Sequence, residues 1–420
     1  MKEDNLFTEL IQVAVGTRTV LSRIPSEDEW QQVYDTAVKQ SLVGVVLSGI
    51  EVIRAKSVEL SVPRVLLLQW IGEVQVIEQQ NKKLDEAAEH LIRVFKNGGL
   101  RSCVLKGQGV ARMYDVRCKK SDVRSQNSEQ RADDNSEQNS DGLSSLSSLN
   151  SLTGTSETFG TLGTNTDNTI GGSLSLRRQP GDIDLWVEGG REKVLQFLKS
   201  SCLKTGTVVI HHVDASIIDG VETEVHFLPS YSYNYLRYVK YKKYFKEEAN
   251  QQFDHFDEQV GFAYPTNRFN AVYLMMHIFR HVFHEGIGLR QLMDYYFVLI
   301  HLTDEERKWA YGKLKWLGIE KVTSAVMYVM KAVFLMDDKY LLCNPSEKTG
   351  KYLLEEIFAG GNFGKFGEQY ESAHSGSSFN LYLKNLKRLG KVYSLCPSEV
   401  LWAPIWKPSH WMWRKWKGYV

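Results

Sequence analysis

The sequence predicts an α+β chain, with helices first, a small α/β segment in the middle and a helical segment at the end. Three observations lead to this prediction. Apolar residues recur at helical spacing near the start, short apolar runs of strand length alternate with helical patterns in the middle, and long helical patterns follow. A length of 420 residues allows two or three domains. We therefore expect an N-terminal helical region at 1–97, an α/β domain at 98–230 and a C-terminal helical domain at 231–420.

Local patterns support the N-terminal helices. Ser26 and Glu29 form the S-x-x-E pattern of a capping box, and apolar residues at helical spacing follow them. A long helix is predicted from about Val65 to Lys96, where Gly98-Gly99 ends it.

Strands and helices alternate in the middle of the chain. The turn-forming pair Asp219-Gly220 separates the last two of the predicted strands. The predicted strands are 101–105, 182–187, 207–215 and 221–227, and the predicted helices between them are 107–114 and 191–200. From residue 231 onwards helices dominate, and the best defined are 267–284, 289–301, 304–317 and 321–335.

A low-complexity insertion interrupts the α/β segment at residues 117–177. Ser, Asn, Thr, Gly, Gln and Asp dominate it, and it includes the run L-S-S-L-S-S-L-N-S-L. Such a composition buries too little apolar surface to offset the entropy of the chain. We predict a disordered surface loop here rather than a domain.

Overall composition limits the function classes. Lys and Arg number 51 against 50 Asp and Glu, which excludes capture of nucleic acid or membrane by overall charge but allows local patches. The first residues, M-K-E-D-N-L, lack the pattern of a signal peptide, and no apolar stretch is long enough for a transmembrane segment. The five cysteines are scattered and never form C-x-x-C. We expect a cytoplasmic protein with free thiols.

The segment G-D-I-D-L-W-V carries the clearest chemical signal. On a strand, Asp182 and Asp184 point to one side, and Ile183, Leu185 and Val187 point to the other. Two adjacent carboxylates repel unless a cation lies between them, and such oxygen ligands suit Mg²⁺, with Mn²⁺ as a further option. The alternative is a solvated edge strand, which the apolar neighbours disfavour. Neutralising either aspartate is expected to leave stability unchanged or slightly raised.

This segment resembles the G-D-h-D-h motif of nucleotidyltransferases of the DNA polymerase β-like superfamily. Upstream, V-L-K-G-Q-G-V-A-R-M-Y-D resembles the L-K-G-x-x-x-x-x-x-Y segment of a large bacterial family of uncharacterised nucleotidyltransferases, in which an arginine, here Arg178, precedes G-D-I-D. Gly107 and Asp182 are 75 positions apart, and removing 117–177 leaves the short spacing of that family. The low-complexity stretch thus falls inside a family motif.

The resemblance implies a small mixed-sheet nucleotidyltransferase domain with a third carboxylate on the strand E-T-E-V-H-F. Strand geometry places Glu222, Glu224 and His226 on one polar side and does not choose between the two acids. Glu224 is favoured because it is central in the strand and directly precedes V-H. Asp182, Asp184 and Glu224 would then form the catalytic and metal-binding set, with His226 as an accessory group.

The resemblance also implies which residues contact the nucleotide. They are Lys106, Gly107, Arg178, Gly181 and Arg290, the last within an L-R-x-L-x-D signature. An alternative for Arg290 is simple pairing with Asp294, four residues later.

One position departs from the superfamily pattern. The superfamily usually has Gly-Ser where this chain has Gly107-Gln108, and that serine binds phosphate. Gly107 still allows backbone amides to approach a phosphate closely.

Two further groups remain open. His277, His281 and His284 share one helix face. They could bind zinc or pack in the core, and His281 could be an accessory group at the nucleotide site. The C-terminal tryptophans alternate with Lys and Arg, which suits stacking on nucleobases, a membrane interface or, most simply, packing against the body. They are Trp402, Trp406, Trp411, Trp413 and Trp416.

These patterns together predict a Mg²⁺-dependent nucleotidyltransferase that moves an NMP from an NTP to a hydroxyl or phosphate acceptor and releases pyrophosphate. The acceptor could be a small molecule, a sugar, a protein or a nucleic acid. The alternative is a nucleotide-binding or interaction protein of the same fold with weak or no turnover. The oligomeric state is not predicted.

Overall fold

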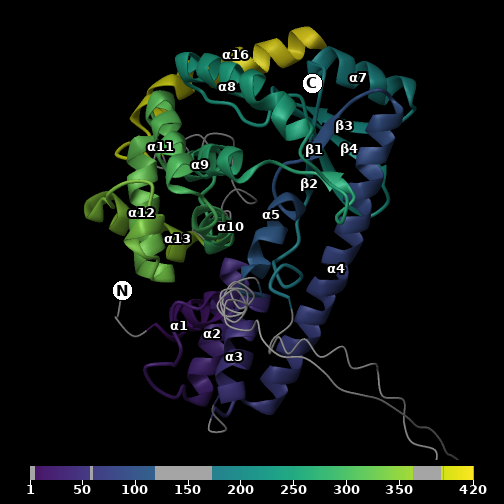
Figure 1. The fold of residues 1–420 in the computed structure, drawn as a ribbon. Coiled ribbons are helices and arrows are strands. Elements are labelled where there is room, and N and C mark those ends of the chain that lie inside the picture. Colours follow the sequence, from purple (N-terminus) through teal and green to yellow (C-terminus); the bar gives the residue numbers. More distant parts are fainter. Residues whose placement is uncertain (1–4, 57–59, 119–172, 363–388, 391, 420) are drawn as a thin grey trace, which may run out of the picture. The chain divides into compact units, whose positions relative to one another are not determined.

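A five-stranded mixed sheet forms the centre of the α/β segment in this computed structural model (Figure 1). The order of its strands is β1-β2-β5-β4-β3. β2 and β5 are parallel, and the other neighbouring strands are antiparallel. The strands are β1 (Ser102–Val104), β2 (Ile183–Val187), β3 (Lys204–Val208), β4 (His212–Ile218) and β5 (Val221–His226). The predicted α+β class and small mixed sheet are confirmed.

The structure describes residues 5–56, 60–118, 173–362, 389–390 and 392–419, with the backbone alone at 116–118. Most of the predicted insertion at 117–177 therefore lies outside the described residues. Among the described helices, none combines the length and the apolar character needed to cross a membrane. Cys103, Cys202, Cys343 and Cys396 are free thiols.

Four helices precede the sheet. They are α1 (Leu6–Val15), α2 (Glu27–Gln40), α3 (Val43–Lys56) and α4 (Arg64–Asn97). The predicted capping box begins α2, because the Ser26 amide donates to Glu29 Oε2 at 2.9 Å and the Glu29 amide donates to Ser26 Oγ at 3.4 Å.

Further helices interrupt and follow the sheet. Between the strands lie α5 (Gln108–Ala111), the 3₁₀ segment η1 (Arg112–Cys118) and α7 (Gly190–Ser200). After the sheet come α8 (Tyr235–Phe253), α9 (Asn267–His284), α10 (Leu289–Ile300), α11 (Asp304–Leu317), α12 (Glu320–Phe334), η2 (Asp338–Tyr340), α13 (Glu347–Gly360) and α16 (Pro397–Lys417). A small hairpin of β6 (Phe256–Asp257) and β7 (Phe262–Ala263) was not predicted.

Helices cover both faces of the sheet. Ile183, Leu185 and Val187 share a buried cluster with residues of α4 and α7. On the other face Trp186 packs against Phe253 of α8 and Phe269 of α9, with ring centroids 4.7 and 5.9 Å apart. Side chains alternate along a strand, so Asp184 lies on the same face as Trp186, toward α8 and α9.

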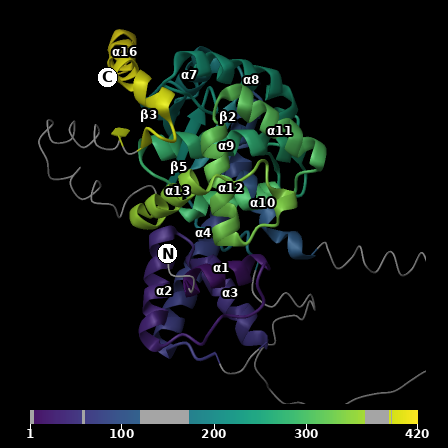
Figure 2. The ribbon, with the colours of Figure 1, turned by 90° about the vertical axis from the view of Figure 1, so that its left-hand side faces the viewer.

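The N-terminal helix α1 lies beside α12 of the C-terminal part (Figure 2). The N-terminal and C-terminal helices share one hydrophobic core. Gln12 of α1 donates to the Val333 carbonyl at 3.0 Å, and Gln40 of α2 donates to the Ile357 carbonyl at 2.9 Å. These buried hydrogen bonds join helices more than 300 positions apart in sequence. The predicted division into three domains at 97/98 and 230/231 stays a prediction.

The single strand predicted at 207–215 is wrong. The end of β3 and the beginning of β4 occupy this range, and the Val209 amide donates to the His212 carbonyl at 3.0 Å across the turn between them. Val208, Val209 and Ile210 made the run look continuous because apolar residues continue through the turn.

The predicted end of the insertion at residue 177 is also wrong. Arg177 is buried and forms ion pairs with Glu51 of α3 and Glu78 of α4. A Cβ added at Gly44 of α3 would lie 2.3 Å from the Arg177 carbonyl oxygen, so this segment contacts α3 directly. The polar composition of 173–177 hid these contacts, because its partners lie far away in sequence.

Candidate active site

Three carboxylates form a row across neighbouring strands. The register pairs Asp184 of β2 with Glu224 of β5, and Glu224 with Asp214 of β4. Asp182 immediately precedes β2 and its side chain is 33% exposed, whereas that of Asp184 is 1% exposed. Two acids of the predicted catalytic set, Asp184 and Glu224, are thus direct register partners.

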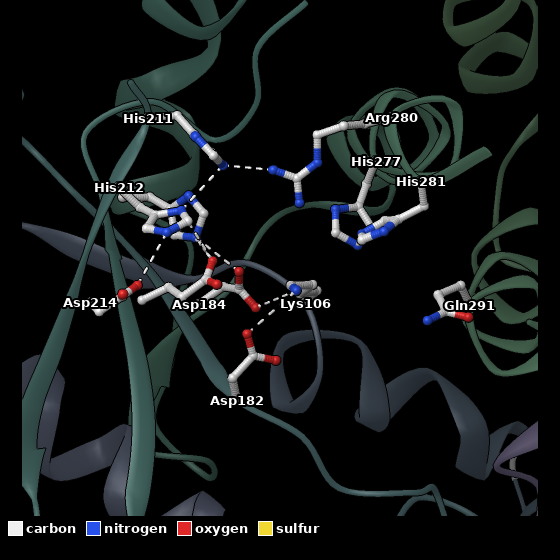
Figure 3. Close-up of polar contacts among 12 residues, drawn as sticks. Lys106, Asp182, Asp184, His211, His212, Asp214, His277, Arg280, His281 and Gln291 are labelled. Atoms are coloured by element: carbon white, nitrogen blue, oxygen red, sulfur yellow. Dashed lines mark hydrogen bonds and ion pairs between the residues drawn. The ribbon is translucent and has the colours of Figure 1, made fainter. Parts of the chain in front are cut away.

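Cationic groups hold these acids together (Figure 3). Lys106 Nζ lies 2.8 Å from Asp184 Oδ2 and 3.8 Å from Asp182 Oδ2. His226 Nε2 lies 2.8 Å from Asp184 Oδ1 and 3.2 Å from Glu224 Oε2. Lys106 therefore occupies the position between the two aspartates where the sequence required a cation.

The charges of this cluster set the pKa values of its members. Burial alone would raise the pKa of Asp184, but Lys106 and His226 hold it below its ordinary value. Burial likewise opposes ionisation of Glu224, but the hydrogen bond from His226 lowers its pKa to about 2. For His226, burial is outweighed by the two carboxylates, which raise its pKa to about 9. His226 is thus an imidazolium at neutral pH.

His212 and Asp214 of β4 extend the cluster and were not predicted. His212 Nδ1 lies 3.2 Å from Glu224 Oε2, and His212 Nε2 lies 3.3 Å from Asp214 Oδ1. The ligand atoms of Asp184, Glu224 and His226 lie within 4.8 Å of one another, as do those of His212, Asp214 and Glu224. The alternation His-x-Asp in β4 has the same period as Glu-x-His in β5, and this signal could have identified the pair.

A pocket opens beside the acids. Its empty volume is about 460 Å³, open solvent included. The residues that line it come from the loop before α5, the segment before β2, and α9 and α10. They are Lys106, Gly107, Arg178, Asp182, Leu274, His277, Ile278, Arg290, Gln291 and Asp294. The predicted nucleotide contacts Lys106, Gly107, Arg178 and Arg290 all belong to this lining.

Arg178 is fixed by Asp294. Its Nε and one terminal nitrogen each donate to a different oxygen of Asp294 at 2.7 Å, and the Tyr114 hydroxyl donates to the same carboxylate at 2.6 Å. Such a bidentate pair is geometrically specific. Asp294 therefore pairs with Arg178, and the alternative in which it pairs with Arg290 does not describe the structure.

Arg290 is a cation with unused donor capacity. Its Nε is buried and has no hydrogen-bond partner among the described residues. Burial, helped by the nearby Arg178, lowers the pKa of Arg290 to about 10. A Cβ at Gly181 would lie 2.7 Å from a terminal nitrogen of Arg290, so Gly181 leaves room for the guanidinium in this position.

The conformation of the loop before α5 requires a glycine at Gly107, but the contacts of Gln108 do not support a role in binding phosphate. Gly107 has a φ of 62° and a ψ of −111°, which a residue with a Cβ rarely adopts. The Gln108 side chain is buried and donates to Asp85 Oδ1 of α4 at 2.8 Å. Gln108 thus anchors the loop to α4, and it is not among the residues that line the pocket.

The three histidines of α9 have different surroundings. His277 lines the pocket, and its Nε2 lies 2.9 Å from Nε2 of His281, while His284 lies 3.4 Å from the hydroxyls of Tyr231 and Tyr233. Burial lowers the pKa of His277 well below its ordinary value. Within the described parts of the chain these three residues form no common ligand set, so the zinc alternative gains no support.

A family model described as an uncharacterised nucleotidyltransferase matches residues 26–117 and 172–334, which is more than half of the chain. The match omits 118–171 and resumes next to the first residue described after the gap. No curated protein and no solved structure matches the chain.

Proposed function

Since the chain belongs to this family of uncharacterised nucleotidyltransferases, we propose that it transfers an NMP from an NTP to a hydroxyl or phosphate acceptor and releases pyrophosphate. The observation that carries the proposal is the register pairing of Asp184 with Glu224, beside a pocket lined by Arg290, whose Nε has no hydrogen-bond partner among the described residues. In this proposal Asp182, Asp184 and Glu224 hold Mg²⁺ or Mn²⁺.

The acids fit a divalent cation. Asp184 Oδ2 is buried and contacts Lys106, but within the described parts of the chain it makes no hydrogen bond of good geometry. Such an oxygen has acceptor capacity to spare, and carboxylate oxygens are the ligands that Mg²⁺ prefers. When bound, the metal ion would neutralise phosphate charge and make the acceptor oxygen more acidic.

The protein's own residues would bind and orient the triphosphate. Lys106 and Arg290 would supply positive charge to it, and Gly107 would allow the backbone to approach it. Asp294 and Tyr114 would hold Arg178 in a fixed position at the wall of the pocket. Catalysis by such a site is mainly positioning and charge neutralisation.

The proposed step conserves atoms and charge. The acceptor oxygen forms a bond to the α-phosphorus, and the bond from that phosphorus to the pyrophosphate oxygen breaks. The proton of a hydroxyl acceptor leaves to water, because Glu224, with a pKa of about 2, is too weak a base to keep it.

A second candidate is a nucleotide-binding protein with weak or no turnover. Gln108 favours it, because the residue at the position of the phosphate-binding serine is engaged with Asp85. The two candidates differ in turnover but share nucleotide binding.

One experiment separates the candidates. The protein is incubated with each of the four NTPs, labelled at the α-phosphate, with Mg²⁺ or Mn²⁺ and cell extract. A labelled acceptor that is absent with the Asp182→Asn variant, which should stay folded because Asp182 is 33% exposed, supports transfer. Nucleotide binding without any labelled product would support the second candidate and contradict the first.

A further inference from the structure

Helix α16 presents an apolar stripe to solvent. Leu401, Ile405, Met412 and Trp416 are 64%, 61%, 56% and 79% exposed, and Trp411 beside them is 54% exposed. Positions 401, 405, 412 and 416 recur at helical spacing and share one face. A contiguous exposed apolar stripe of this kind indicates a binding surface.

The opposite face fixes the orientation of α16. Trp406 stacks on Tyr231 and Tyr233, with ring centroids 5.7 and 5.4 Å apart. The Arg191 guanidinium lies 4.5 Å from the ring centroid of Trp413. Trp402 also packs against the hydrophobic core. The packing of the tail against the body, the simplest expectation for these tryptophans, is therefore confirmed for Trp402, Trp406 and Trp413, and this packing directs the apolar stripe outward.

The charge of α16 is entirely positive beyond its first turn. No Asp or Glu occurs from Val400 to Val420, whereas four cations lie there: Lys407, Arg414, Lys415 and Lys417. Lys415 Nζ lies 5.0 Å from the centroid of Trp411, and Lys417 Nζ lies 4.8 Å from that of Trp416. The exposed indoles are thus each paired with an ammonium group.

We propose that α16 docks the protein on an anionic phospholipid surface, with the stripe inserted at the level of the headgroups. An exposed apolar face, flanking Lys and Arg, and tryptophans at the polar boundary are the features of helices that lie in a membrane interface. Helix α16 does not qualify as a membrane-spanning helix, so it would lie in the plane of the surface.

Other occupants fit the same observations less well. A second copy of this helix would bring two sets of four cations together. Single-stranded nucleic acid would use the indoles and the cations, but it leaves the exposed Leu401, Ile405 and Met412 without a role.

The neighbouring helix α8 extends the surface. Tyr238 of α8 lies 6.3 Å from Trp406, so the first turns of α8 are beside α16. Leu236 and Val239 on these turns are 68% and 44% exposed, and further lysines follow them in α8. The family match ends at residue 334, so this proposal does not depend on the proposed nucleotidyl transfer.

Co-sedimentation of the full chain with vesicles tests the proposal. Vesicles of phosphatidylcholine containing phosphatidylglycerol should retain the protein, and vesicles of phosphatidylcholine alone should retain much less. The Ile405→Glu/Met412→Glu variant should bind at least about tenfold more weakly, because each added carboxylate is costly at the interface. Lys407→Gln/Lys415→Gln/Lys417→Gln should weaken binding to the anionic vesicles, and added salt should have the same effect.

A matched control uses another exposed apolar residue. Val65 of α4 is 81% exposed, and Val65→Glu should bind vesicles as the wild type does. Circular dichroism should show that all variants are folded. The proposal is overturned if the wild type stays in the supernatant with anionic vesicles, or if Val65→Glu weakens binding as much as the α16 variants do. It is also overturned if the α16 substitutions alter only dimer formation or oligonucleotide binding, measured by light scattering and fluorescence polarisation.

Discussion

At the scale of single residues, the two aspartates of G-D-I-D have different surroundings and should respond differently to mutation. Asp184 is 1% exposed and contacts both Lys106 and His226, whereas Asp182 is 33% exposed and lies 3.8 Å from Lys106. Asp184→Asn leaves two buried cations without their shared partner, which costs roughly 3–5 kcal/mol of unfolding free energy. Asp182→Asn should cost less than about 1 kcal/mol.

Both variants should lose nucleotidyl transfer under the proposed function. Urea unfolding in the presence of EDTA measures the stability part alone. Equal stability of the two variants would contradict the structural environment described for Asp184. The sequence led to the opposite expectation, unchanged or raised stability, because repulsion between the aspartates was visible and Lys106 was too distant in sequence to be placed between them.

Glu224 and Glu222 provide a second test. Glu224 is the register partner of Asp184 and contacts His226, whereas Glu222 is exposed and lies at the turn end of β5. We expect Glu224→Gln to lower turnover at saturating Mg²⁺ by at least about 100-fold, the usual scale for one acid–base group. Glu222→Gln should change turnover little. A larger loss from Glu222→Gln would mean that the metal-binding set is not the one proposed.

Substitution of Arg290 tests nucleotide binding in the pocket and leaves the proposed metal ligands unchanged. Its Nε has no partner within the described residues, so Arg290→Gln should preserve the melting temperature. If its guanidinium contacts the triphosphate, the Kd for an NTP should rise about tenfold or more, since one charge-assisted hydrogen bond is worth roughly 1.5–3 kcal/mol. Isothermal titration measures the Kd, and Arg93→Gln on the surface of α4 is the control. An unchanged Kd for Arg290→Gln would remove this residue from the nucleotide site.

At the scale of elements, the sequence predicted the helices after the sheet well. Strong apolar periodicity and local caps define them, as in α11, which begins after its N-cap residue Thr303, paired with Glu306 in a capping box, and ends before Gly318. The strands β3 and β4 were harder to predict from the sequence, because β3 is mostly exposed and has no apolar alternation. Register and the contacts of Arg178 with Asp294 depend on pairing between distant segments, which no local pattern encodes.

The C-terminal border of the insertion can be tested by replacing the insertion with linkers that end before or after residues 173–177. Replacing residues 119–172 with a short linker should change stability little, because closing a longer loop costs only about 0.6 kcal/mol per doubling of its length. Extending the replacement to 119–177 also removes Arg177 and the Leu176 carbonyl, which accepts from Asn81 at 2.7 Å. The longer replacement should lower the unfolding free energy by roughly 3 kcal/mol more.

Thermal unfolding of the two replacements, in the same buffer, measures this difference. Equal melting temperatures would show that the contacts of Arg177 with Glu51 and Glu78 contribute nothing measurable. A large loss with the shorter replacement alone would show that residues 119–172 support the fold and are not a dispensable insertion.

At the scale of the whole molecule, the sheet and the helices that cover it bury several histidines in the neutral form. Burial lowers the pKa of His277 well below its ordinary value and that of His284 to about 3, with the Arg280 guanidinium adding to the effect. His211 and His281 shift in the same direction for the same first cause. In the unfolded chain these groups titrate near about 6.5. Acid should therefore destabilise the protein well above the range in which its carboxylates are protonated.

The sign follows from proton counts. Below pH 6.5 the unfolded chain binds protons that the folded chain does not, so stability falls as the pH falls, by up to about 1.4 kcal/mol per pH unit for each such histidine. For His284 this loss continues down to a pH of about 3. Glu224, with a pKa of about 2, adds to the loss of stability only below its ordinary pKa of 4.5. His226, with a pKa of about 9, makes stability depend on pH only above its ordinary pKa of 6.5, where stability falls as the pH rises. The interval from pH 6.5 to 5 therefore reports the buried histidines.

Urea unfolding with EDTA at several pH values between 7.5 and 5 gives the slope of stability against pH, and this slope gives the number of protons taken up on unfolding. This number should exceed one per molecule at pH 5.5. His284→Gln should lower this uptake by about one proton, because glutamine cannot titrate while a polar side chain remains beside Tyr231 and Tyr233. His90 is exposed on α4, and His90→Gln should leave the pH dependence as it is in the wild type. If stability is flat from pH 6.5 to 5, or if the two variants change the uptake equally, the histidines of α9 are not held neutral by their packing.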